Sequence, residues 1–433
     1  METRLMKSLR KTIEYLFYLF VFLLPWQTKL ILRPADTNFN EISLYANHLL
    51  LIIILILFFV YKFREKKNRE QISSLWCALI IGELFVLMSF FFAADQVLAF
   101  YHYVLFVGGV GLFCLMREGT ETVYYKEGKL DKFKVIYSFL AGIFLQAALG
   151  IYQFLAQKSF VCKYFGLAQH DAYTPGTSVI ETFSGRWLRA YGGFDHPNIF
   201  GGVLVIALIL TGYLLARKKV IRSKQEIGES IFLFIFYFIA LISLFFTFSR
   251  AAWLAYGAGL LILLVALIIQ KDRWILGRFL ALLFFSIIML FIIAYPYRDL
   301  LHVRIAGETR LEQKSLSERQ EYLIQAKDLI KENLLFGVGT GNYVSALERQ
   351  DQNKKPIWIY QPVHNVLLLL WAESGVFAFV SFLAFLFFLI KKNRRAVFSG
   401  AVFMAIIILL LLDHWLLSLP FGVLFLFFIL GLI

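Results

Sequence analysis

The sequence is poor in cysteine and in charged residues. It has three cysteines in 433 residues, and two of them lie in apolar runs. This number and spacing exclude a disulfide framework and a CxxC metal site. Only 17% of the residues are charged, whereas 60% are hydrophobic and the mean hydropathy is +0.72. A soluble domain of this length does not carry so much apolar surface.

Features of several other protein classes are also missing. We find no internal repeat and no low-complexity segment. The first ten residues are basic and precede an apolar run, as in a signal peptide, but no small-residue cleavage site follows, so we expect the first membrane helix here. The "GVGTG" segment (337–341) lacks the Lys-Ser/Thr of a P-loop and does not follow a strand. It is therefore predicted to be a tight turn that ends a helix.

Repeated apolar runs of about 18 to 25 residues predict an all-α, polytopic membrane protein. We expect a single transmembrane-helix domain over residues 1–433, with one long, partly helical loop at 296–363 before a late span. About twelve spans are expected, at 14–32, 43–61, 75–93, 99–116, 135–157, 198–216, 230–248, 252–270, 276–295, 364–390, 398–412 and 416–433.

The distribution of positive charge predicts the orientation of these spans. One set of alternate loops, with the N-terminus, holds 26 of the 43 Lys and Arg residues. The other set holds 17, of which 10 lie in the loop 296–363, and loops of that length obey the positive-inside rule poorly. Without that loop the ratio is 26 to 7. Both termini are therefore predicted to be cytoplasmic, and the net charge of +14 needs no nucleic-acid partner.

The long loop contains a predicted amphipathic helix within "SLSERQEYLIQAKDLIKENLLFGVGTGNY" (315–343). Ser315 and Glu318 have the spacing of a capping box, and apolar residues then recur at helical spacing. Gly337 and Gly339 follow as a stop signal. We expect this helix to lie on the outer surface, folded over the membrane bundle.

Five arginines of the outer loops are candidates for an anion site. Arg250 follows a serine in a very short turn, Arg186 and Arg189 would share a face of a helical turn, and Arg310 and Arg319 bracket the start of the loop helix. The planar guanidinium suits an anionic ligand such as a diphosphate. The alternatives are that Arg250 reaches the membrane interface and that the others are solvated surface charges.

Two polar segments on the same face have structural and functional interpretations. In "FDHPNIFGG", Pro197 fits the first position of a helix, and Asp195, His196 or Asn198 can cap it. His196 and Asn198 can also line an outer pocket. Asp413 and His414 separate the last two spans, and we interpret them as an interfacial cap.

The run "QPVHNVLLLLWAESGVF" (361–377) places an ionisable residue at the mouth of an apolar helix. A helix that begins at Pro362 or His364 puts the imidazole at the positive end of its dipole, which disfavours imidazolium. A neutral histidine can accept a proton as a general base. Trp371 and Gly375 would share its face, with Gly375 allowing close helix packing. The alternative is a histidine that caps the helix.

These motifs resemble the O-antigen ligase family, whose members also include polysaccharide polymerases and protein O-oligosaccharyltransferases. The family signature is His, then Asn, Ser or Gln, nine residues, Gly, two residues, and Gly, Thr or Tyr. His364, Asn365 and Gly375 match it, whereas Ala378 departs from it at the last position. The segments "RAYGGFDHPNIFGG", "FSRAAWLAYGAG" and "LLFGVGTGNY" are also similar to family segments.

The resemblance implies a metal-independent, inverting glycosyltransferase without cofactors. It would move a glycan from undecaprenyl diphosphate to a saccharide hydroxyl, such as one of lipid A–core, at the outer (periplasmic) face of the inner membrane. By motif match His364 would act as base, and Arg250 and Arg319 would hold the diphosphate. Further candidates are Arg189 and Arg186 for the diphosphate and His196, Asn198, Asn365 and Arg310 for the pocket.

Other functions are compatible with parts of this pattern. Within the family, the acceptor can be a second lipid-linked glycan, as in a polymerase, or a protein. A transporter of lipid-linked glycans should show paired inverted repeats and interrupted helices, and the sequence indicates neither. A non-catalytic assembly protein would have little need for a base beside an arginine cluster.

Overall fold

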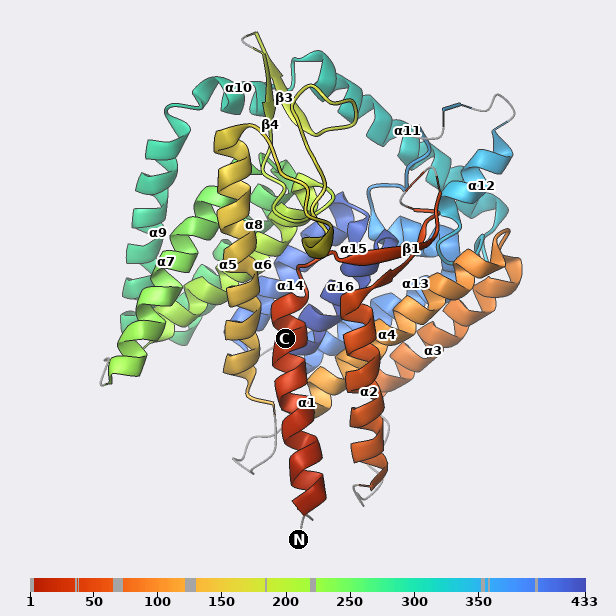
Figure 1. Ribbon diagram of the computed structural model, residues 1–433, viewed down its shortest axis with the longest axis horizontal. Coiled ribbons are helices and arrows are strands. Elements are labelled where there is room, and N and C mark those ends of the chain that lie inside the picture. The colour runs from red at the N-terminus through yellow and green to blue at the C-terminus, as the bar shows by residue number, and fades with distance from the viewer. Residues whose placement is uncertain are drawn as a thin grey trace.

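The computed structural model describes residues 4–35, 37, 39–64, 73–120, 130–183, 185–218, 223–351, 355–356, 359–393 and 396–433. A bundle of helices carries shorter elements at one end, the upper end in Figure 1. The elements are α1 (Arg4–Leu23), β1 (Lys29–Arg33), β2 (Ile42–Tyr45), α2 (Ala46–Arg64), α3 (Ser74–Ser89), α4 (Gln96–Thr120), α5 (Lys132–Ala156), β3 (Val179–Thr182), β4 (Gly185–Leu188), α6 (Pro197–Arg217), α7 (Lys224–Phe246), α8 (Arg250–Gln270), α9 (Arg273–Ala294), α10 (Arg298–Ala306), α11 (Arg310–Glu332), α12 (Tyr343–Gln350), α13 (Val366–Asn393), α14 (Val397–Leu412), α15 (Trp415–Ser418) and α16 (Pro420–Leu432).

Nine helices in the described part of the chain are long and apolar enough to cross a membrane: α2 to α9 and α13. They confirm the expected polytopic, helical class. The other three expected spans correspond to α1, α14 and α16, and the last two have only 16 and 13 residues. α6 lies at the centre of the bundle, and 83% of the residues in its apolar stretch are buried within the protein.

The first expected span, 14–32, is wrong in its second half. α1 ends before Pro25, and the chain then turns into β1, which pairs antiparallel with β2. Proline lacks the N–H that a continuing helix needs. The Asn47 side chain donates hydrogen bonds to the carbonyls of Leu24 (3.1 Å) and Trp26 (3.0 Å) and thereby holds this turn. Apolar composition alone did not reveal the turn.

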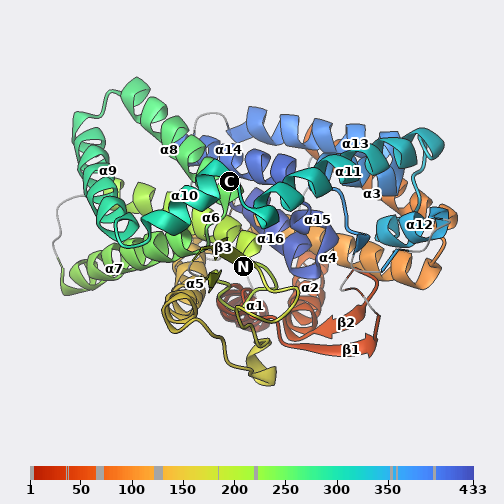
Figure 2. The ribbon, with the colours of Figure 1, turned by 90° about the horizontal axis from the view of Figure 1, so that it is seen from above.

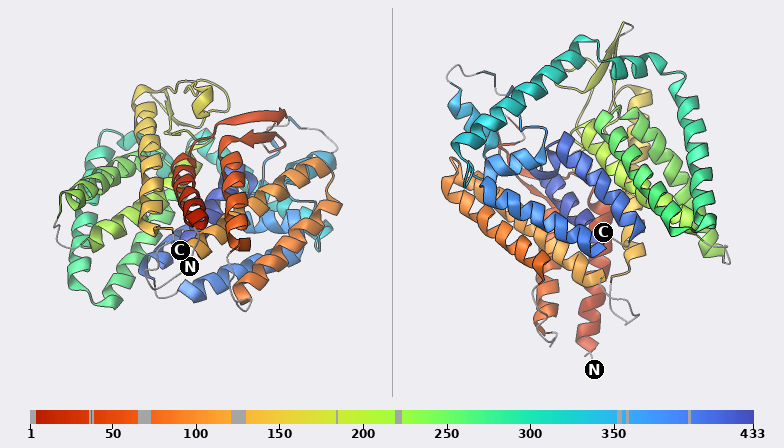
Figure 3. Two further views of the ribbon diagram at one scale, coloured as in Figure 1. Left: turned by 60° about the horizontal axis from the view of Figure 1, so that its bottom comes forward. Right: turned by 180° about the vertical axis from the view of Figure 1, so that it is seen from behind.

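The long loop covers one end of the bundle with α10, α11 and α12 (Figure 2; Figure 3, right). α11 packs on the bundle through one face, which confirms the expected amphipathic helix; its buried apolar residues are Tyr322, Ala326, Leu329 and Ile330. Its expected start is wrong. The helix begins at Arg310 after Thr309, so Ser315 and Glu318 lie inside it and form no capping box. Glu312 in the first turn is buried and anchors this earlier start.

α13 is interrupted at Gly375, whose φ of +79° and ψ of 175° are not helical. A Cβ at Gly375 would lie 2.0 Å from the Leu335 carbonyl oxygen, so only glycine permits this approach. The segment 334–339 runs alongside the break, and its Val338 N–H donates to the Ala372 carbonyl at 2.9 Å. The expectation of one continuous helical face, and of no interrupted helix, is therefore wrong.

The glycine-rich turn after α11 fills this break. Gly337 has a φ of +70°, and a Cβ there would lie 2.3 Å from the Glu373 carbonyl carbon. Gly339 donates its N–H to the Glu373 carbonyl at 2.9 Å. The predicted tight turn is confirmed, and its glycines serve backbone-to-backbone packing that satisfies peptide groups freed by the broken helix.

The last expected span is also interrupted. α15 and α16 meet at Leu419, whose ψ of 141° is extended, and Pro420 begins α16. A Cβ at Gly422 would lie 1.7 Å from the Trp415 carbonyl oxygen, so the two helices touch backbone to backbone. This corner places the Asp413–His414 segment at the same end of the bundle as α11.

Candidate functional site

His364 lies just outside the membrane helix that it precedes. α13 begins at Val366, so the expected start at or before His364 is wrong. Asn365 is the cap: its Oδ1 accepts from the Leu368 N–H at 3.0 Å, and its Nδ2 donates to the Leu411 carbonyl at 3.2 Å. Asn365 therefore has a structural role, and the His364 imidazole is not needed to cap the helix.

His364 belongs to a compact group with Asp413 and His414, which we call the histidine group. One donor atom from each residue lies within 4.8 Å of the other two. The two imidazole rings are perpendicular at a centroid distance of 4.8 Å, and the Tyr322 ring stacks nearly parallel to His364 at 5.9 Å. Asp413 and His414 connect α14 to α15 and are buried.

Asp413 and His414 were predicted only to cap a span. As the C-cap of α14, Asp413 has that role, but the structure also places both residues beside His364. The available signal was a pair of ionisable residues between two apolar runs, on the face predicted for His364. Their proximity depends on how α13, α14 and α15 pack, which no local pattern reveals.

Burial and mutual charge control protonation in the histidine group. Burial lowers the pKa of His364 below its usual value of 6.5, the nearby Asp413 carboxylate opposes this, and Arg319 adds to it. Burial lowers the pKa of His414 to about 3. Burial raises the pKa of Asp413, but the neighbouring histidines outweigh this effect and leave it below its usual range. At neutral pH the group holds neutral imidazoles beside an ionised carboxylate.

The histidine group can also hold a cation. Among the described residues, His364, Asp413 and His414 form the group whose donors approach closely enough for a metal ion. Imidazole nitrogens and a carboxylate oxygen are common ligands of divalent metals. His414 already shares its Nδ1 with the Ser418 hydroxyl at 2.7 Å, which leaves its Nε2 as the free nitrogen.

His196 has the structural role considered from the sequence, and Asn198 contacts the histidine group. His196 caps α6 by accepting the Asn198 N–H on its Nδ1 at 3.1 Å. Its Nε2 lies 2.7 Å from the Ser178 hydroxyl. The Asn198 Nδ2 donates to Asp413 at 3.2 Å and so connects α6 to the histidine group.

Arg189 is buried and already engaged in hydrogen bonds. Its Nε donates to the Thr247 carbonyl at 2.7 Å, and its Nη2 donates to the Asn198 Oδ1 at 2.9 Å. Only 5% of the residue is exposed, and burial lowers the pKa of its guanidinium. Arg189 therefore positions Asn198 and the turn before α8.

Arg186 and Arg310 lie apart from this core. Arg186 lies on β4 opposite Glu181 of β3, so the expected helical face shared with Arg189 is wrong. The exposed Arg310 side chain forms a 3.5 Å ion pair with Glu181. Both arginines belong to the β3–β4 hairpin and its contact with the start of α11. The local strand pairing was not recognised because each strand has only four residues.

Arg250 shares a buried carboxylate with a second arginine. Its Nη2 lies 3.1 Å from Glu312 Oε2, and Arg304 pairs with the other oxygen of Glu312. Arg304 also donates from Nε to the Phe248 carbonyl at 2.8 Å. The side chains of Arg250, Arg304 and Glu312 are 33%, 11% and 5% exposed, respectively. Two guanidinium groups and one carboxylate leave a net positive charge, with Arg250 the more accessible. Sequence reasoning missed Arg304 and Glu312.

Arg319 lies on α11 between this arginine pair and the histidine group. It precedes Tyr322 by three residues, so both share a face of the helix. Its charge lowers the pKa of both His364 and His414, and it also lowers that of Arg304. The Arg319 guanidinium makes no hydrogen bond or ion pair with the part of the chain that the structure describes. It is therefore a cation available to a ligand.

The fold and this site define a multi-pass membrane protein with a neutral histidine and several arginines gathered at one end of its helix bundle. Residues 235–383 match the family model described as O-antigen ligase. Residues 235–383 therefore carry the O-antigen ligase family domain. This finding confirms the resemblance in the sequence. No curated protein and no solved structure matches the chain.

The matched range covers α8 to α12, both arginines of the Glu312 bridge, Arg319 and His364. Asn198, Asp413 and His414 lie outside it. The site is thus completed by segments on both sides of the family domain.

Proposed function

We propose that the chain transfers a glycan from undecaprenyl diphosphate to a hydroxyl group of a saccharide acceptor such as lipid A–core, with inversion at the anomeric carbon. The observation that supports this most strongly is the position of His364. Its imidazole lies next to the buried Asp413 carboxylate, and Arg319, which has no partner among the described residues, is close enough to lower its pKa. A base and a diphosphate-binding cation are therefore neighbours.

In the proposed reaction His364 removes the proton of the acceptor hydroxyl while its oxygen attacks the anomeric carbon. The bond from that carbon to the diphosphate breaks, and its electron pair stays on the diphosphate oxygen. Arg319 and Arg250 stabilise the negative charge that develops there. Asp413 stabilises the imidazolium formed on His364, as the aspartate of a catalytic triad does. The proton then passes to solvent, and the lipid diphosphate leaves.

Glu312 has a defined role in this scheme. Its buried carboxylate offsets the repulsion between Arg250 and Arg304 before the donor binds. Arg250 is the more exposed of the two and can turn towards a diphosphate while Arg304 keeps its contact with Glu312. Arg189 and Asn198 act indirectly, since they support the Asp413 side of the histidine group.

The same geometry also suits a polymerase or a protein O-oligosaccharyltransferase, because these enzymes differ from a ligase in the acceptor that they use. The interrupted α13 is a feature expected of a transporter, but its break is filled by the backbone of segment 334–339. The polar groups described above gather at one end of the bundle, whereas transporter sites lie near the membrane midplane. We therefore favour transfer to a saccharide.

A reconstitution experiment tests this function. Purified protein is incubated with an undecaprenyl-diphosphate glycan and, separately, with lipid A–core, with more of the lipid-linked glycan, or with an acceptor peptide. We expect a product mass equal to lipid A–core plus the glycan, and the same yield in the presence of EDTA. A product only with the second or third acceptor would reassign the function, and loss of product in EDTA would indicate a metal at the histidine group.

We also propose that both termini are cytoplasmic and that the loop 296–363 is periplasmic. In a variant with all three native cysteines replaced by serine, a cysteine at Gln350 should react with a membrane-impermeant maleimide on intact spheroplasts. A cysteine at Gln225, in the first turn of α7, should react only after lysis. Labelling of Gln225→Cys in intact spheroplasts would contradict this orientation.

A further inference from the structure

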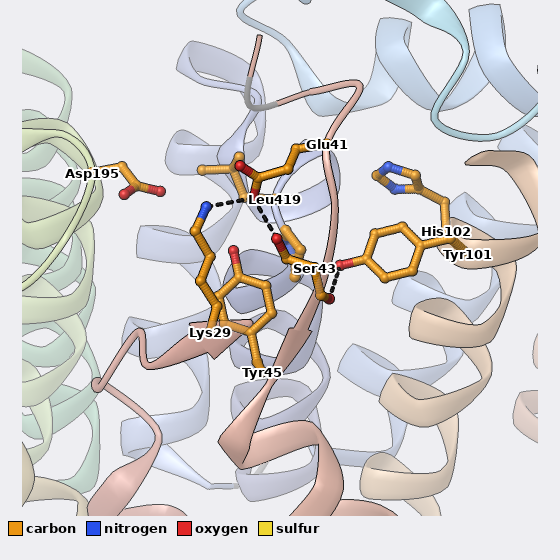
Figure 4. Close-up of a pocket in the computed structure, with 9 residues that line it drawn as sticks. Lys29, Glu41, Ser43, Tyr45, Tyr101, His102, Asp195 and Leu419 are labelled. Atoms are coloured by element: carbon orange, nitrogen blue, oxygen red, sulfur yellow. Dashed lines mark hydrogen bonds and ion pairs between the residues drawn. The ribbon is translucent and has the colours of Figure 1, made fainter. Parts of the chain in front are cut away.

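A second polar cavity lies beneath the β1–β2 hairpin, outside the site described above (Figure 4). It has a volume of about 320 Å³, including the solvent at its mouth, and its polar lining includes Lys29, Glu41, Tyr45, Tyr101 and Asp195. β1, β2, α4 and the loop before α6 supply these residues, and the corner between α15 and α16 closes one side.

Some polar groups of this cavity are already paired and form a fixed wall. Lys29 and Glu41 form an ion pair at 2.5 Å, and the Ser43 hydroxyl donates to the same Glu41 oxygen. The Tyr101 hydroxyl donates to the Ser43 carbonyl at 2.8 Å. These contacts join the hairpin to α4 and hold donors and acceptors in place.

Two other polar groups face the cavity without a partner among the described residues: the Asp195 carboxylate and the Tyr45 hydroxyl (Figure 4). Asp195 is accessible to solvent, yet it stands in a recess. A ligand that donates a hydrogen bond to Asp195 would satisfy this carboxylate.

Residues at or beside the cavity lining contact the histidine group or adjoin it in the chain. Phe39, two residues before Glu41, packs its ring edge-on against His414 at 5.5 Å. Leu419, which lines the cavity, follows directly after α15, the helix that begins next to His414. Asp195 immediately precedes His196, which is electrostatically coupled to Asp413. The arginines approach the histidine group from α8, α10 and α11, which are different elements.

We propose that this cavity binds a sugar residue of the acceptor and holds it beside His364, an inference that rests on the proposed function. Sugar hydroxyls both donate and accept hydrogen bonds, which suits two carboxylates, a lysine and tyrosine hydroxyls. Two carboxylates facing a single lysine disfavour a phosphate or another anion. The recess is small, so it would take hydroxyl groups of one sugar residue, the residue that accepts the glycan, and not a whole oligosaccharide.

The test separates saccharide binding from transfer. Binding of lipid-free core oligosaccharide, prepared by deacylating and hydrolysing lipid A–core, is measured by calorimetry for the wild-type protein, Asp195→Asn and Tyr45→Phe. The KM for lipid A–core and for the lipid-linked donor is measured in the transfer assay. Glu181→Gln, a carboxylate on β3 outside the cavity, is the matched control.

We expect Asp195→Asn to weaken oligosaccharide binding and to raise the acceptor KM by about tenfold or more, because a hydrogen bond to a charged group is lost. Tyr45→Phe should act in the same direction, while the donor KM and the Glu181→Gln variant stay unchanged. No binding to the wild type, or equal binding to Asp195→Asn, would overturn the inference. Binding of the oligosaccharide without any transfer would reject the proposed function and leave the sugar site standing. Transfer with the same acceptor KM in Asp195→Asn and wild type would support the proposed function and reject the sugar site.

Discussion

Replacing His364 with alanine should reduce transfer by about 10² to 10⁴-fold, the usual contribution of a positioned acid–base group. The donor should still bind, because the arginines that hold it remain. His364→Gln should be equally inactive, since glutamine fills a similar volume and forms hydrogen bonds but cannot take a proton at neutral pH. Turnover of the purified variants in the transfer assay measures the effect, and thermal unfolding in detergent confirms that they are folded.

His302 provides the matched control for this prediction. It is an exposed histidine on α10, and His302→Ala should keep wild-type turnover. Asn365, rather than His364, caps α13, so losing the imidazole should not destabilise that helix. A glutamine variant with full activity would show that His364 positions the acceptor and does not act as a base.

The pH profile gives a second readout of the same role. A general base works in its neutral form, and burial lowers the pKa of His364 below 6.5. Transfer should therefore persist through neutral pH and fall as the pH drops below about 6.5. The Asp413 carboxylate raises the pKa of His364. Asp413→Asn should consequently move the acidic limb to lower pH while also reducing kcat, because the imidazolium loses its stabilising charge. An unchanged limb would exclude this coupling.

Replacing Arg319 or Arg250 with alanine should reduce kcat by about 10² to 10³-fold, as removal of one group that stabilises the leaving charge does. The larger effect is expected for Arg319, because its guanidinium has no partner among the described residues and is available to the donor. Lysine at position 319 should restore only part of the activity, since it cannot form a bidentate contact with phosphate oxygens. Transfer assays with varied donor concentration separate the effects on kcat and on KM.

Arg310→Ala is the matched control for the arginines. Arg310 begins the same helix as Arg319 but is exposed and pairs with Glu181, so its loss should leave kcat unchanged. In Arg250→Ala, Arg304 still neutralises Glu312, and the protein should remain folded. Wild-type kcat in both Arg319→Ala and Arg250→Ala would reject the diphosphate-binding assignment.

Much of the membrane architecture could be predicted from apolar length, because a membrane-spanning helix must satisfy its own backbone hydrogen bonds. The errors in the spans share one feature. At Pro25, Gly375 and Leu419 the chain leaves the helix within or beside an apolar run, and at the first two positions contacts from other elements satisfy its backbone. The carbonyls near Pro25 are held by Asn47, and the break at Gly375 by the segment 334–339. Periodicity does not detect such partners, since they are distant in sequence.

Only those residues of the candidate site that belong to a recognised sequence motif could be predicted. The family signature pointed to His364, whereas Asp413 and Glu312 follow no local pattern. A buried carboxylate between two guanidiniums, or beside two imidazoles, becomes meaningful only after α11 is laid across the bundle. Arg189 is the opposite case. An arginine in an outer loop suggested anion binding, but the Arg189 guanidinium is engaged in hydrogen bonds to Thr247 and Asn198.

The break in α13 has a consequence for how the sequence can vary. The Leu334 carbonyl accepts the Val376 N–H at 3.0 Å, so this hydrogen bond closes a loop of the chain between the two residues. This hydrogen bond holds the end of α11 against α13, and His364 lies within the loop that it closes. The separation of the end of α11 from the break in α13 is therefore set by this one hydrogen bond and not by the length of the chain between Leu334 and Val376.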